Sequence, residues 1–82
     1  MSSDREDLIT ANEEARKALR VQAKSAWVSL MVALDGAGRD DDEALAGIDL
    51  TVAMYGLEKL KSLQSEMRRL LAGRRKLLVA DA

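Results

Sequence analysis

The sequence predicts an all-α antiparallel two-helix hairpin that pairs with a second copy into a dimeric four-helix bundle. Its 82 residues contain no proline and two aromatic residues, while helix-forming Ala, Leu, Glu, Lys and Arg dominate. The one dense run of turn-forming residues, DGAGRDDD at positions 35–42, lies close to the middle of the chain. Two helical arms of nearly equal length on either side of a short turn predict a hairpin.

The first helix is expected over residues 3–34. Ser3 is a candidate N-cap, because Glu6 stands three residues later in the spacing of a capping box. The helix should end near Leu34, since Gly36 follows shortly after it. The turn is expected over residues 35–42.

The second helix is expected over residues 41–72, with Asp40 as N-cap and Glu43 at the third position. Gly73 marks its end, and the sequence leaves open whether the basic tail over residues 73–82 is helical. Each helix would be roughly 45 Å long at 1.5 Å per residue, so the two can pair along their whole length. With the loop centred near residue 38, residues 27–34 should lie beside residues 43–50.

The inner face of each helix follows from a turn of about 100° per residue. On the first helix this face is mostly small, whereas the second helix supplies larger side chains to pack against it. The expected inner residues are Leu8, Ala15, Leu19, Ala26, Leu30 and Ala33, then Leu60, Leu63, Met67, Leu70 and Leu71. Gly47 and Gly56 also fall within the second helix, where glycine is less favourable than alanine. Either the close approach of another helix or mere evolutionary drift would account for them.

The half of the hairpin next to the loop is apolar nearly all round. The residues concerned are Trp27, Val28, Met31, Val32, Ile48, Leu50, Met54, Tyr55 and Leu57. Two helices cannot bury each other on every side, so a further protein surface must cover this half. The protein that buries this half is expected to be a second copy of the chain or a different protein, and a second copy can bury it when the different protein is absent.

No residue pattern points to catalysis. The chain has no Cys and no His, which removes the usual nucleophile pairs and zinc ligands. Asp49 could accept a hydrogen bond from the Trp27 indole, or could be an acid for catalysis. A structural hydrogen bond or simple exposure is expected instead of catalysis, because no second carboxylate or base stands at helical spacing in the same half. We therefore expect no enzyme, and no catalytic, metal or cofactor-binding residues.

A basic stretch lies near the end of the expected second helix. Arg68, Arg69, Arg74, Arg75 and Lys76 are candidates for contact with an anion such as a phosphate. The expected hairpin also brings the acidic residues Asp4, Glu6 and Asp7 beside this stretch, so we expect ion pairs there instead. The net charge of −1 lacks the positive field of a dedicated nucleic-acid binder.

In length and layout the chain resembles families of short helical hairpins, among them Rop-type RNA-binding dimers and the needle subunits and small co-chaperones of type III secretion systems. Many small phage-encoded inhibitors are also compact helical dimers. No motif carries over residue by residue, so the resemblance implies only the hairpin form.

The function that the sequence predicts is a small protein-binding module of the inhibitor, adaptor or chaperone type. Its expected partners are itself, as a homodimer or larger, and another protein. The alternatives are a nucleic-acid-associated regulator that uses the basic stretch, and an accessory hairpin of a secretion system or phage. No apolar run approaches the roughly 20 residues of a membrane span, and we expect a cytoplasmic protein.

Overall fold

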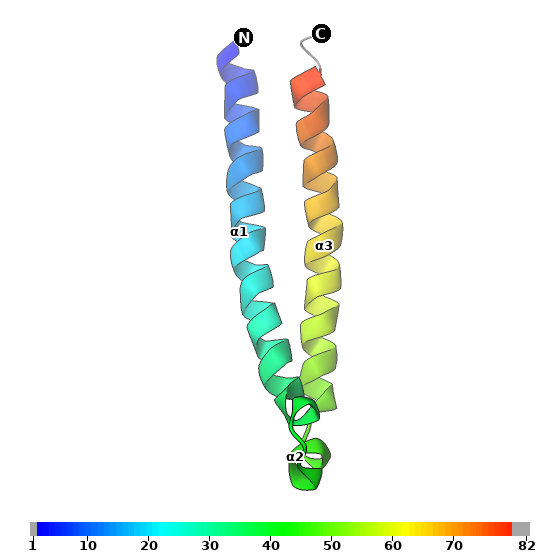
Figure 1. The fold of residues 1–82 in the computed structure, drawn as a ribbon. Coiled ribbons are helices and arrows are strands. Elements are labelled where there is room, and N and C mark those ends of the chain that lie inside the picture. Colours follow the sequence, from blue (N-terminus) through cyan, green and yellow to red (C-terminus); the bar gives the residue numbers. More distant parts are fainter. Residues whose placement is uncertain (1, 80–82) are drawn as a thin grey trace.

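The structure, a computed structural model, describes the backbone of residues 2–79 and the side chains of residues 4–79. The element order is α1 (Ser2–Leu34), η1 (Asp35–Gly38), α2 (Asp42–Ala46) and α3 (Leu50–Val79). The two long helices run antiparallel side by side, and the short α2 projects beyond their joined ends (Figure 1). The all-α antiparallel hairpin is confirmed, whereas the dimeric bundle stays a prediction.

The hairpin is long and thin, with extents of 63 × 18 × 15 Å. Its radius of gyration is 18.6 Å, against the roughly 12 Å expected of a compact domain of this length. Among the described side chains, the buried apolar ones are Ala26, Ala53 and Leu63. Two helices in contact along one seam therefore form very little core. No described helix has the length and apolar character needed to cross a membrane.

The seam between the long helices follows a seven-residue repeat. Its buried and half-buried residues recur at spacings of three and four, which is the pattern of a coiled coil. On α1 the repeat runs through Arg5, Ile9, Asn12, Arg16, Leu19, Ala23, Ala26, Leu30 and Ala33, and on α3 through Ala53, Gly56, Leu60, Leu63, Met67, Leu70, Gly73 and Leu77. The half-buried Leu34 and Glu66 fall outside the repeat.

The predicted inner face of α1 is right near the loop and wrong near the N-terminus. Leu8 is 56% exposed and Ala15 is also exposed, while Asn12 and Arg16 lie in the seam. A straight helix of 3.6 residues per turn drifts about 20° per heptad from a seven-residue repeat, so an inner face extrapolated from the loop slides off the seam after two or three heptads. On α3 the predicted inner residues lie in the seam except Leu71, which is 36% exposed.

The expected single helix over residues 41–72 is wrong, because the chain breaks between α2 and α3. Gly47 forms the C-cap of α2, and Asp49 restarts the helix by accepting the Val52 N–H on its Oδ1 at 3.0 Å. The N-cap of α2 is Asp41, not Asp40, since its Oδ1 accepts the Glu43 N–H at 3.0 Å.

At its other end α3 continues beyond the expected stop at Ala72, through Gly73 to Val79. Arg5 of α1 reaches across to this last stretch, where its Nε donates to the Leu77 carbonyl at 2.8 Å and its Nη2 to the Leu78 carbonyl at 3.2 Å. A cation that binds carbonyls at a helix C-terminus complements the helix dipole. The predicted N-cap at Ser3 depends on a side chain outside the described ones, and residues 80–82 of the expected tail lie outside the described residues.

The pairing register differs from the expected one. Asn12 Nδ2 donates to the Leu70 carbonyl at 2.8 Å, and a Cβ on Gly56 would lie 3.3 Å from Leu30 Cβ. Residues 27–34 therefore lie beside the first turns of α3 and not beside residues 43–50. The reason is that η1, α2 and the link to α3 together take up residues 35–49, a longer connection than the turn expected over residues 35–42.

Candidate protein-binding surface

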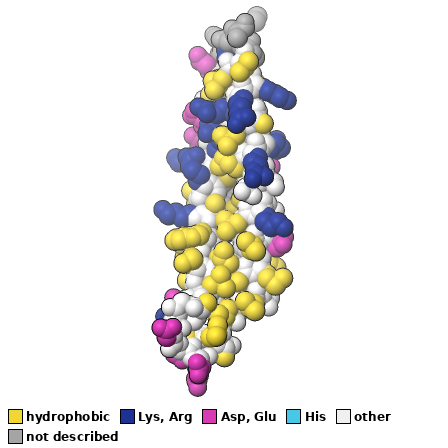
Figure 2. Space-filling view, turned by 45° about the vertical axis from the view of Figure 1, so that its right-hand side comes forward, with side chains coloured by type: hydrophobic (Ala, Val, Ile, Leu, Met, Phe, Trp, Pro, Cys, Tyr) yellow, Lys and Arg dark blue, Asp and Glu magenta, His cyan; other side chains and the backbone are white. Residues whose placement is uncertain are grey.

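The surface next to the loop carries large apolar side chains on both helices. We call it the apolar surface and define it as Trp27, Val28, Met31, Val32, Leu50, Met54, Tyr55 and Leu57. All eight are exposed, from 49% for Val28 to 74% for Tyr55. Figure 2 shows hydrophobic side chains gathered on the loop-proximal half of one face, with Lys and Arg around the other half. The sequence placed these eight outside the seam, and that they bind a partner stays a prediction.

Ile48, the ninth predicted residue, is half-buried and belongs to the loop. Its Cγ1 would lie 3.3 Å from a Cβ on Gly36, and the same Cβ would lie 2.1 Å from the Ala44 carbonyl oxygen. Only a glycine permits this approach, so η1 packs directly on α2 with Ile48 beside them. Ile48 thus packs beside the contact between η1 and α2, and that it also faces a partner stays a prediction.

The seam beneath the apolar surface is narrow. Ala26 and Ala53 are buried there, and a Cβ on Gly56 would lie 3.3 Å from Leu30 Cβ and 3.5 Å from the Ala26 carbonyl oxygen. Close approach of α1 therefore accounts for Gly56, the first of the two explanations left open by the sequence, whereas Gly47 is a helix cap. Because the backbones come so close, the seam fits Leu30 only against a glycine, and the eight large residues of the apolar surface lie outside it.

The apolar surface has two sides. On one side a groove of about 470 Å³ runs between the helices, lined by Val28, Ser29, Val32, Ala33, Gly47, Asp49 and Val52. Val52 is 42% exposed and was missed from the sequence, although it stands between Ile48 and Tyr55 at spacings of four and three. On the other side Trp27 and Met31 share a face of α1, since they are four residues apart.

The predicted hydrogen bond from the Trp27 indole to Asp49 is not formed within the described residues. The Asp49 carboxylate caps α3 through the Val52 N–H and lines the groove. Asp49 is therefore an exposed residue with a structural hydrogen bond, as the sequence indicated, but the donor is the Val52 N–H and not the Trp27 indole, because the helix is broken before Asp49.

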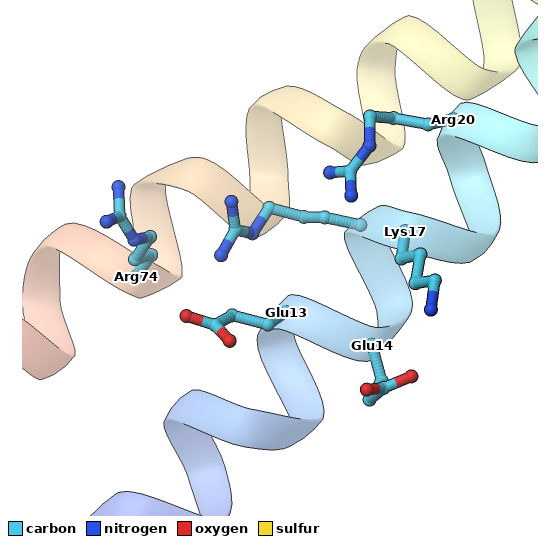
Figure 3. Close-up of a pocket in the computed structure, with 6 residues that line it drawn as sticks. Glu13, Glu14, Lys17, Arg20 and Arg74 are labelled. Carbon is cyan, nitrogen blue, oxygen red and sulfur yellow. The ribbon is translucent and has the colours of Figure 1, made fainter.

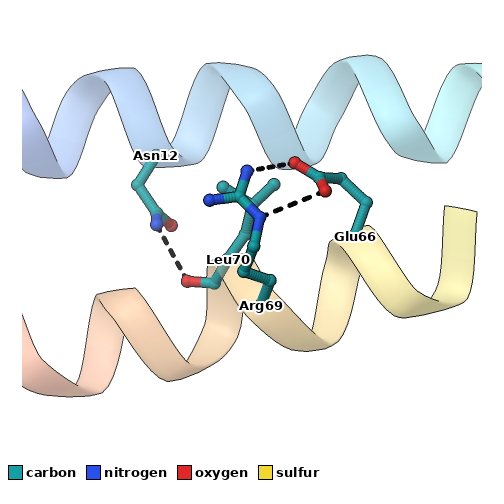
Figure 4. A network of polar contacts seen from close by, with 4 residues as sticks. All are labelled: Asn12, Glu66, Arg69 and Leu70. Carbon is teal, nitrogen blue, oxygen red and sulfur yellow. Dashed lines mark hydrogen bonds and ion pairs between the residues drawn. The ribbon is translucent and has the colours of Figure 1, made fainter.

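The half of the hairpin near the chain termini is held by polar contacts. Asn12 Nδ2 donates to the Leu70 carbonyl at 2.8 Å (Figure 4). Asn12 Oδ1 also accepts from Arg16 Nε at 2.8 Å. On α3, Arg69 Nε donates to Glu66 Oε2 at 3.1 Å, and a second contact joins Arg69 Nη2 to Glu66 Oε1. This hydrogen bonding lowers the pKa of the Glu66 carboxyl and raises the pKa of Arg69.

The predicted anion-contact residues are not gathered into one site. Arg69 pairs with Glu66, and Arg74 joins residues of α1 around a hollow of about 280 Å³. The hollow is lined by Glu13, Glu14, Arg16, Lys17, Arg20 and Arg74 (Figure 3). Arg68, Arg75 and Lys76 are exposed elsewhere on α3.

The ion pairs expected between this stretch and Asp4, Glu6 and Asp7 can form within one chain or between two chains. None forms within the chain among the described residues, and pairing between two chains stays a prediction. The longer loop shifts these acidic residues toward the end of α3. The α1 side chain that binds there is Arg5.

Comparisons with known proteins give no family for this chain. No family model matches it, and no curated protein and no solved structure matches it either. Within the described residues there is also no group of three or more side chains placed to hold a metal ion.

Proposed function

We propose that the chain is a small non-enzymatic protein-binding module that acts through its apolar surface and through self-association. In this role it would inhibit, link or chaperone a partner protein. The observation that carries the proposal is the contrast at the loop-proximal half, where a narrow seam of Ala26, Leu30, Ala53 and Gly56 lies beneath eight exposed large apolar side chains. Contiguous apolar patches on soluble proteins usually mark interaction sites.

The total surface supports the same proposal. The chain exposes 6567 Å², whereas a compact monomer of 9.0 kDa would expose about 4900 Å². The difference is roughly 1700 Å², about twice the area of roughly 800 Å² that each partner contributes to a standard protein interface. The total surface of the chain is therefore large enough for a standard interface with a partner.

Sedimentation equilibrium of the purified chain at micromolar concentration tests the proposal. We expect a dimer or larger assembly, and we expect Met54→Asp to raise its dissociation constant at least about tenfold, because a charge would be buried against apolar side chains. Val21→Asp is the matched control, since Val21 and Met54 are each 66% exposed and Val21 is not part of the apolar surface.

Circular dichroism at the same concentrations shows whether each variant is still helical. A well-folded wild-type monomer with a cooperative melt would contradict the self-association part of the proposal. Equal weakening by Val21→Asp would show that the wrong surface has been chosen.

A further inference from the structure

We infer that a second copy of this chain covers the Trp27 side of the apolar surface, antiparallel to the first, so that the acidic loop of each copy lies on basic residues of the other. The inference rests on the proposed function and specifies the arrangement of its self-association. It comes from the order of charges along one face of the hairpin.

That face continues past the apolar surface along both helices. On each helix the residues recur at spacings of three and four and so share one side. They are Met31, Trp27, Lys24, Arg20 and Lys17 on α1, and Leu50, Met54, Leu57, Lys61, Gln64 and Arg68 on α3. Arg20 and Gln64 line one hollow together, which places the two rows on the same face of the hairpin.

Charge changes in a fixed order along this face. The loop is acidic, since residues 35–43 contain five acidic residues and one basic residue, Arg39, which pairs with Asp35. Next come the apolar side chains, and then the basic residues Lys24, Arg20 and Lys17. Figure 2 shows the same order, with Asp and Glu at the loop tip, hydrophobic side chains above them and Lys and Arg beyond.

The distances fit an antiparallel pair. At 1.5 Å per residue, the 33 residues of α1 account for about 50 Å of the 63 Å length, so the loop projects roughly 13 Å beyond its end. The loop tip is then about 20 Å from the level midway between Trp27 and Met31. A two-fold axis at that level would place the partner's loop tip about 20 Å away in the opposite direction, or roughly 13 residues along α1, close to Arg16 and Lys17.

The basic residues at that position carry an excess of positive charge. The hollow there is lined by Arg16, Lys17, Arg20 and Arg74 against Glu13 and Glu14. An acidic loop would be attracted to it, whereas a parallel pair would bring two acidic loops together and repel. The antiparallel pair also leaves the groove lined by Val28 and Val32 uncovered, so another protein can bind there.

Charge reversal distinguishes the two arrangements. Asp40→Lys with Asp42→Lys leaves the Asp41 cap intact, and we expect it to raise the dimer dissociation constant about tenfold, since each exposed ion pair contributes little. Lys17→Glu with Arg20→Glu should have a similar effect, and all four changes together should restore wild-type affinity. In a parallel dimer the loop reversal would instead tighten association, and that result, or no restoration, would overturn the inference.

A distance measurement gives an independent readout. The chain has no cysteine, so Ala37→Cys places a single spin label in the exposed loop of each copy. Double electron–electron resonance should give well-separated labels in the antiparallel dimer, up to about 40 Å apart, which is twice the 20 Å estimated for the loop tip from the helical rise. A dimer with adjacent labels would overturn the inference and leave the proposed function standing, whereas a monomer would overturn both.

Discussion

The two halves of the hairpin place their polar and apolar residues in opposite ways. Near the loop the seam contains Ala26, Ala53 and Gly56 around Leu30, and the eight large side chains of the apolar surface lie outside it. Near the termini the α1 side of the seam contains Asn12 and Arg16, and charged residues such as Lys17 lie outside it. The half near the termini thus forms its polar contacts within the hairpin, whereas the half near the loop presents an apolar exterior.

This difference suggests separate roles for the halves. A polar residue within a coiled-coil seam fixes the register at a cost in stability, and Asn12 does so here through its bond to the Leu70 carbonyl. The narrow seam near the loop contributes little burial of its own, because small side chains remove little apolar area from water. The stability of the loop-proximal half is therefore expected to depend on what covers it.

The largest effect is expected from Gly56→Leu, which tests the narrow seam directly. A Cβ alone would already lie 3.3 Å from Leu30 Cβ, so a leucine must push the helices apart. We expect a loss of about 1–3 kcal/mol of stability, as for an overpacked core. Thermal melts followed by circular dichroism at two protein concentrations measure it. An unchanged melting temperature would mean that the seam is not close-packed.

Gly73→Ala, on the same helix, is expected to raise the stability of the chain instead of lowering it. The nearest atom to a Cβ at this position is Asn12 Nδ2 at 3.8 Å, an ordinary contact distance. Replacing a helical glycine by alanine should then raise stability by up to about 1 kcal/mol, because alanine is the better helix former. The same melts test it, and destabilisation by this small change would show that the terminal half is packed as tightly as the loop half.

The sequence predicted the hairpin and most of the apolar surface, because both follow from composition and from the spacing of large apolar residues. The sequence did not predict the pairing register of the two long helices or the break at Gly47. Gly47 is nevertheless a residue that ends a helix, and Asp49 is one that begins a helix. The unbroken apolar pattern on both sides concealed that signal. The seam near the termini was also missed, since no search for apolar residues selects Asn12 or Arg16.

The smallest effect is expected at Glu66, whose partner Arg69 lies on the same helix. The hydrogen bond lowers the pKa of Glu66 in the folded chain, so any stabilisation by this pair is present at neutral pH and is lost as the pH falls through the folded pKa, below the ordinary value of 4.5. Both groups are open to solvent, and water and salt screen such a pair.

We therefore expect Glu66→Gln to leave the melting temperature at pH 7 unchanged within error, and to flatten its fall between pH 5 and pH 3 only slightly. Glu58→Gln is the control, because Glu58 is exposed on α3 and has no ion pair among the described residues. Melts of the wild type and both variants across this pH range provide the test. The contrary result is that Glu66→Gln lowers the melting temperature at neutral pH as much as Gly56→Leu does. The half near the termini would then depend on its surface charges. In that case the proposed difference, in which only the loop-proximal half needs a partner for its stability, would be wrong.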